Sequence, residues 1–190
     1  MRRIAIVALL VVALVAGLWA LGVAAQPAPT YQGDQLGMEQ RESPQEYVAR
    51  ARASISEGEE AVWALVSFQG ELSPAEAADV VEPVRRVSAV VFPGAPPRPI
   101  PEPVAGRSRA EVFTHEADRA RAAGFDVADS PQSVLVKDAP AVLRDIAADS
   151  RVFAVEALPP DARVGTFGIS PVRPHSFDAA PSSNVSPMST

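Results

Sequence analysis

Three side chains at helical spacing are the chain's best candidates for metal chemistry. Glu111, His115 and Asp118 stand at positions i−4, i and i+3, so one face of a helix presents all of them. His115 does not begin a zinc-protease motif, because Arg119 occupies the place of its second histidine. The chain has no cysteine, and its other histidine is the distant His175. We therefore interpret the trio as a solvated charged face and predict no metal site.

The same region alternates arginines with carboxylates, a pattern typical of ion pairs on a helix surface. The residues are Arg107, Arg109, Glu111, Glu116, Asp118, Arg119 and Arg121. The sequence contains no nucleophile elbow, phosphate loop or dinucleotide fingerprint. We predict no catalytic residue and no cofactor, so the chain is expected not to be an enzyme.

The chain begins with an apolar segment, Ile4 to Ala25, preceded by Arg2 and Arg3. As a helix this segment reaches roughly 33 Å, about the thickness of a bilayer's hydrocarbon core. The two arginines favour a cytoplasmic N-terminus. The sequence thus predicts that residues 1–25 form a single transmembrane anchor with the rest of the chain outside the cytoplasm.

A cleaved signal peptide is the alternative interpretation of this segment. Val23-Ala24-Ala25 has the small-x-small form of a cleavage site, and cleavage at Ala25 leaves a secreted protein that begins at Gln26. The apolar run exceeds the usual length of a signal peptide's core, and Trp19 suits an interfacial position. These two features favour a retained anchor.

Composition limits the partners of the exported part. The net charge of the chain is −6, which argues against binding to nucleic acid. The absence of cysteine rules out a disulfide framework, so a packed core must stabilise the fold. Residues 26–42, rich in Pro, Gly and polar residues, read as a linker. Residues 43–160 carry the periodic patterns of a domain, and the Pro- and Ser-rich residues 161–190 read as a disordered tail.

Within 43–160, apolar runs alternate with helix-start signals. Three helices are expected to open with Ser-x-x-Glu capping boxes at Ser43, Ser73 and Ser108. Six prolines between Pro93 and Gly106 predict a stiff extended connector, preferred here to a PxxP ligand. The expected elements are a helix over Ser43–Glu57, a strand over Ala61–Phe68, a helix from Ser73, a strand over Val87–Phe92, a helix from Ser108 to Gly124, a strand over Ser133–Lys137, a helix from Pro140 and a strand over Arg151–Ala157.

The order of these elements gives two βαβ halves with a helix inserted between them. Two right-handed halves that interleave form one antiparallel sheet, the α+β arrangement called ferredoxin-like or split βαβ. The first and third strands are then central, which fits their uniformly apolar runs, AVWALVSF and SVLVK.

Two segments carry a family resemblance. AVWALVSFQGELSPAEAADVV and APAVLRDIAADSRVFAVEALP resemble the two halves of a subtilase propeptide, a ferredoxin-like protease-inhibitor module. The second segment matches that family's closing pattern at Leu143, Ile146, Ala147, Asp149, Arg151, Val152, Val155 and Glu156. The resemblance implies a ferredoxin-like fold and a stand-alone protease inhibitor or folding assistant.

The chain departs from this family in two places. A proline loop and an additional helix, between Gly94 and Gln132, replace a tight hairpin. Pro159-Pro160 begins the segment that lies in the protease cleft in such inhibitors, and proline cannot donate the backbone hydrogen bonds of that docking. The favoured prediction is therefore a membrane-anchored, non-catalytic interaction module with a protein partner, and the inhibitor is the alternative.

Side-chain alternation along the first strand adds one further expectation. Trp63 and Leu65 point to one face of the sheet, and Val62, Ala64 and Val66 point to the other. Since the crossover helices cover a single face, another element must cover the second. The helices over Ser43–Glu57 and Ser108–Ala123 are the two candidates.

Overall fold

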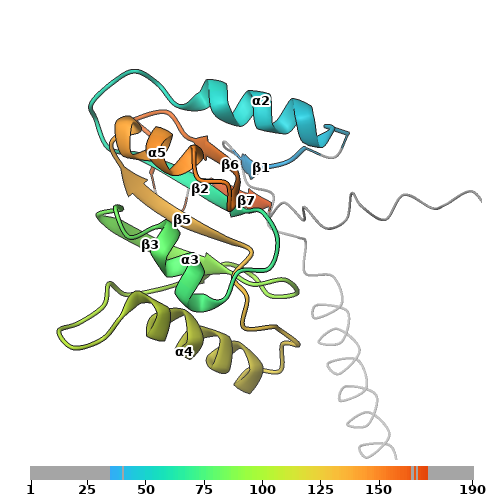
Figure 1. Ribbon diagram of the computed structural model, residues 1–190. Helices are drawn as coiled ribbons and strands as arrows, with labels where there is room; N and C mark the ends of the chain where they lie inside the picture. The colour runs from blue at the N-terminus through green and yellow to red at the C-terminus, as the bar shows by residue number, and fades with distance from the viewer. Residues whose placement is uncertain (1–34, 40, 164, 166, 171–190) are drawn as a thin grey trace, which may run out of the picture. The chain divides into compact units, whose positions relative to one another are not determined.

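The most apolar run of the described chain forms the centre of a sheet. In the computed structural model, every residue of β2 (Val62–Phe68) is buried, and β2 pairs antiparallel with β5 (Ser133–Asp138) and with β6 (Val152–Ala157). β5 also pairs antiparallel with β3 (Arg86–Val91), which pairs with the short β4 (Arg98–Pro99). The strand order is β4-β3-β5-β2-β6, so β2 and β5 are both internal, as predicted (Figure 1).

The structure describes residues 35–39, 41–163, 165 and 167–170. It confirms a mixed α+β domain built on an antiparallel sheet. The remaining elements are β1 (Gln35–Gly37), α2 (Pro44–Ser54), α3 (Pro74–Val80), α4 (Arg109–Ala122), α5 (Pro140–Ala147) and β7 (Gly168–Ser170). The proline-rich connector contains the strand β4, which the sequence did not predict. β4 has only two residues, too few for an alternating pattern.

Three of the helices begin at the predicted capping boxes. In α2, α3 and α4 the serine hydroxyl accepts the backbone N–H of the glutamate three residues later, and the glutamate carboxylate accepts the serine N–H. These paired bonds satisfy amides that the first helical turn leaves free. The serines are Ser43, Ser73 and Ser108.

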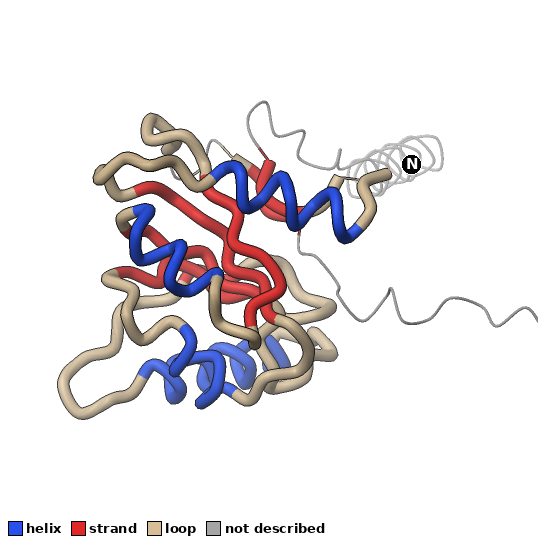
Figure 2. Tube along the Cα trace, turned by 45° about the horizontal axis from the view of Figure 1, so that its top comes forward, coloured by secondary structure: helices blue, strands red, loops and turns tan. Residues whose placement is uncertain are grey.

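Helices α3 and α5 cover one face of the sheet, and α4 packs against α3 (Figure 1). Val62, Ala64 and Val66 on β2 join a core cluster with Leu143 of α5 and Phe113 of α4. In both views the strands lie between α2 and α4 (Figures 1 and 2). Because Phe113 packs with Val62, Ala64 and Val66, the inserted helix α4 does not cover the other face of the sheet, which carries Trp63 and Leu65.

The second face is covered mainly by two short strands and by α2. Trp63 and Leu65 cluster with Leu36 of β1 and with Phe167, which precedes β7. β1 and β7 pair in parallel. Helix α2 packs along β6. The predicted lid role is therefore confirmed for the leading helix, and β1 and β7 share it.

The predicted domain boundaries need correction at both ends. Residues 26–42 were expected to be a linker, but Leu36 is fully buried on the sheet. Residues 161–190 were expected to be a disordered tail, but Gly168–Ser170 pair with β1. The folded unit therefore extends beyond 43–160 on both sides, because the apolar second face needs these segments as cover.

The predicted anchor, residues 1–25, lies outside the described residues. Within the described ranges, none of the helices combines the length and the hydropathy required of a membrane span.

Leu65 provides the first test of this packing. It is fully buried on β2, beneath β1 and β7. We expect Leu65→Ala to lower the free energy of unfolding by roughly 2–5 kcal/mol, because it removes buried methyl groups and leaves a cavity. Urea unfolding measures this loss. Val104→Ala is the control, because Val104 is 70% exposed and its truncation should change stability by less than about 0.5 kcal/mol. Equal effects of the two variants would contradict a covered second face.

Gly37 provides the second test. Its φ is +111°, and a Cβ built there lies 1.7 Å from the backbone oxygen of Ser170. Gly106 is a matched control, since its φ is +84° but nothing lies within 4 Å of its Cβ position. Gly106→Ala should therefore cost only backbone strain, about 1–2 kcal/mol. We expect Gly37→Ala to cost clearly more in urea unfolding, since β7 must move away from β1. Similar losses in the two variants would show that β7 does not pack on β1.

Candidate functional site

Glu111, His115 and Asp118, the residues considered as candidate metal ligands, lie along one groove but do not form a ligand set. Glu111, His115 and Asp118 line a shallow groove between α4 and the start of α3. The Glu111 carboxylate accepts the Ser108 N–H at 2.9 Å, and the Asp118 carboxylate accepts Arg121 Nη1 at 2.8 Å. In the described part of the chain, no group of three or more His, Cys, Asp or Glu residues is arranged to hold a metal ion.

The ion pairs predicted on α4 are partly surface and partly buried. Arg121 and Asp118 pair at the surface. Glu116, expected to be a surface residue, is only 2% exposed, and Arg119 and Arg98 both donate to its carboxylate. The prediction was wrong for Glu116 because Arg98, on β4, brings a second partner over the helix.

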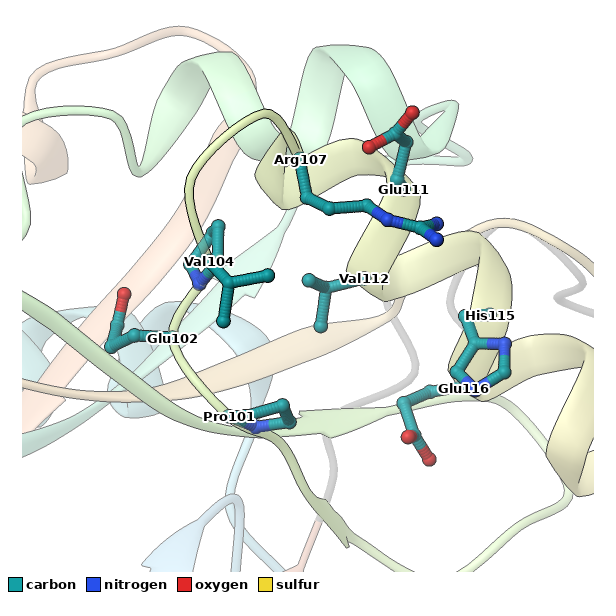
Figure 3. A pocket seen from close by; sticks show the side chains of 9 residues that line it. Pro101, Glu102, Val104, Arg107, Glu111, Val112, His115 and Glu116 are labelled. Carbon is teal, nitrogen blue, oxygen red and sulfur yellow. The ribbon is translucent and has the colours of Figure 1, made fainter.

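A hollow lies between the proline-rich connector and α4 (Figure 3). Its volume is about 280 Å³. In Figure 3, Val104 and Val112 point toward one another across it, above Pro101. The side chains of Arg107 and His115 stand at its rim. The hollow is thus apolar in the middle and polar at its edge.

Glu102 fixes the wall of this hollow to the rest of the domain. Its carboxylate accepts the Val87 N–H of β3 at 2.7 Å and Arg109 Nη2 of α4 at 2.9 Å. Nearby, the Ile100 side chain is buried and its N–H donates to the Ser88 carbonyl at 3.0 Å. Together with the fixed φ angles of the prolines, these bonds hold the connector in one conformation.

A tight turn presents the lip of the hollow. The Arg107 N–H donates to the Val104 carbonyl at 3.0 Å, and Gly106 supplies the positive φ that this turn requires. Val104, at 70% exposure, is one of the two large exposed apolar side chains among the described residues. The turn therefore holds the backbone of an exposed apolar residue close to that of an arginine.

The size and lining of the hollow limit what it can hold. Glu116 lines it, and Arg98 and Arg119 both donate to its carboxylate. The volume lies at the lower limit for small-molecule sites, which are usually about 300–1,000 Å³. A single side chain of a partner fits this space better than a complete metabolite.

A second cluster of polar groups is buried beneath α2. Glu156 of β6 is 3% exposed, and its carboxylate accepts the Gly37 N–H at 2.6 Å, the Tyr47 hydroxyl at 3.3 Å and Nη1 of Arg50. Arg50 also donates to Glu42 and to the Gly37 carbonyl. One carboxylate thus ties β1 and α2 to β6.

The protonation of this cluster follows from its burial. Burial raises the pKa of Glu156, against the opposing effect of the bonds from Gly37 and Arg50. Burial also raises the pKa of Tyr47, which keeps its hydroxyl protonated as a donor. We assign this cluster a structural role. Sequence reasoning missed it, although a single carboxylate inside the apolar run VFAVEA was a detectable signal.

Comparison with known proteins adds no relative. A scan against protein-family models finds no match, and searches of curated proteins and of solved structures also find none. A function for this chain therefore rests on the geometry described above.

The Glu156 cluster predicts a pH dependence of stability. Because the pKa of Glu156 is raised above its ordinary value of 4.5 by burial, the folded chain binds more protons than the unfolded chain just above that pH. This carboxyl's contribution to stability is therefore lost as the pH rises through its folded-state pKa. We expect the stability of the wild type relative to Glu156→Gln to fall as the pH rises from 4.5. Urea unfolding of both proteins across this range measures the difference, and a wild-type advantage that grows with pH would contradict the assignment.

Proposed function

We propose that this chain is a membrane-anchored, extracytoplasmic interaction module that acts by binding a protein and not by catalysis. We place the partner on the hollow between α4 and the proline-rich connector. One observation carries this proposal. The domain uses both faces of its own sheet for its core, and the rigid hollow beside α4 stays open with an exposed apolar lip.

The edges of the sheet are poor sites for a partner strand. On one side α2 lies along β6, and the Ala157 N–H donates to Ser54 Oγ at 2.7 Å. On the other side β4 has only two residues, one of them Pro99, which lacks an N–H. Short, proline-containing or covered edges resist strand addition. This supports a partner bound through side chains in the hollow over one bound through a sheet edge.

For the fold we propose the ferredoxin-like class, with a split βαβ core. The core halves are β2-α3-β3 and β5-α5-β6, and the order β3-β5-β2-β6 is the order that interleaving predicts. The insertion between the halves consists of β4 and α4. On this view the hollow belongs to the insertion and not to the shared core. Function is commonly added to a fold through such sites outside the core.

The alternative, a propeptide-like protease inhibitor, has the strand order in its favour and the segment after β6 against it. That segment folds back on its own domain, since the Leu158 N–H donates to the Trp63 carbonyl at 2.8 Å. The ring centroids of Phe167 and Trp63 are 6.3 Å apart. An inhibitor of this type would have to release these contacts and uncover Trp63 before the segment could enter a protease cleft.

The location of the module, tethered to the membrane and outside the cytoplasm, is part of the proposal. It rests on the apolar residues 1–25 and on the preceding arginines, which favour a retained anchor over cleavage at Ala25. A tethered module meets its partner at a high local concentration, so a small binding surface suffices.

Site-specific photo-crosslinking tests the proposed binding surface. The photoreactive residue p-benzoylphenylalanine replaces either Val104, at the lip of the hollow, or Arg52, an exposed residue of α2. In the full chain in its native membranes, we expect a discrete protein adduct from position 104 and none from position 52. The substitution Val112→Glu places a carboxylate in the hollow, and it should abolish adduct formation at position 104. The absence of an adduct at position 104, or the same adduct at both positions, would overturn this surface.

A further inference from the structure

We propose that the hollow beside α4 recognises an extended acidic peptide, with one aliphatic side chain inserted between Val104 and Val112 and a neighbouring carboxylate bound by Arg107. This inference rests on the proposed function and specifies the chemistry of the partner. Its evidence is the shape of the hollow, the charges around it and the turn that joins its apolar and cationic parts.

The shape favours a peptide over a compact ligand. The hollow of about 280 Å³ is small for a complete metabolite and has room for an aliphatic side chain. It continues into the shallow groove of about 510 Å³ that reaches Ser73 at the start of α3, and Arg107, Glu111 and His115 line both spaces. A hollow that shares lining residues with a shallow groove matches an extended chain that inserts one side chain and lays its neighbours along the surface.

The charges around the hollow select the sign of the partner. Three carboxylates near it already have cationic partners within the domain: Glu102 has Arg109, Glu116 has Arg98 and Arg119, and Asp118 has Arg121. Glu111 caps the first turn of α4. In the described ranges, the Arg107 side chain takes part in no hydrogen bond or ion pair, although it lines both spaces. The complementary group on a partner is therefore a carboxylate, which a guanidinium binds through two parallel hydrogen bonds.

The turn at the lip of the hollow sets the spacing between the aliphatic side chain and the carboxylate that a bound peptide must have. Because the Arg107 N–H is bonded to the Val104 carbonyl, the backbone of Arg107 and the apolar lip are held close together on a rigid segment. A partner residue that fills the hollow therefore places its near neighbours beside Arg107. His115, on the same rim, offers a further donor (Figure 3). Binding to such a preformed site avoids much of the entropy cost of ordering it.

Selection from a phage-displayed library of random decapeptides, with the purified full chain as target, tests the inference. We expect enriched peptides to carry an aliphatic residue within two positions of Asp or Glu. Arg107→Glu should weaken their binding at least about tenfold, since a charge-assisted contact is replaced by repulsion. Arg52→Glu is the matched control: it makes the same charge change at another exposed arginine, on α2, and should leave binding unchanged. Replacing the peptide carboxylate by lysine should restore binding to the Arg107→Glu variant.

The outcomes separate this inference from the function on which it rests. Peptides whose binding is lost with Val104→Asp but which lack an acidic residue, and which Arg107→Glu does not weaken, would overturn the acidic specificity and leave the binding surface standing. Equal losses with Arg107→Glu and Arg52→Glu would also overturn it, since they would reflect the net charge of the domain. If no enriched peptide depends on Val104, the inference fails, whereas the proposed function fails only if position 104 gives no specific adduct with a protein in native membranes.

Discussion

The structure depends on one constraint, the burial of apolar side chains on both faces of β2. Because neighbours along a strand point to opposite faces, Val62, Ala64 and Val66 need cover on one side, and Trp63 and Leu65 need cover on the other. Helices α3 and α5 supply the first cover. The second requires chain from outside the two βαβ halves, and the domain takes it from segments that precede and follow them. This requirement explains why two strands of three residues belong to the folded unit.

Covering the second face buries polar groups, and one hydrogen-bond network around Glu156 gives them partners. β1 pairs with β7, and it lies beside Glu156 on an otherwise apolar strand. The Gly37 N–H and Arg50 both bind that carboxylate, so these polar groups of β1 and α2 have a partner where the two elements join the sheet. A buried carboxylate without such donors would be strongly destabilising. The cluster therefore serves the fold.

Much of this architecture follows from local signals, and the parts that do not are non-local. The capping boxes at Ser43, Ser73 and Ser108 and the apolar runs of β2 and β5 set the main elements and their order. The pairing of β1 with β7 joins residues more than a hundred positions apart, and three-residue segments carry no periodicity, so no sequence pattern indicated it. No sequence pattern indicated the hollow either. Its position depends on how Glu102 ties the proline-rich connector to Val87 and Arg109.

The central claim is that the domain closes its own sheet and so leaves the hollow beside α4 as the surface for a partner. Hydrogen–deuterium exchange of the full chain, followed by mass spectrometry, tests this most directly. The account predicts that the amides of Gly37, Leu158 and residues 168–170 exchange slowly, close to the rate of the β2 amides, because they are bonded or buried on the sheet. Exchange of these segments at the rate of an unstructured chain would contradict it. The apolar face around Trp63 and Leu65 would then be open, and that face would be the better candidate for the partner's site.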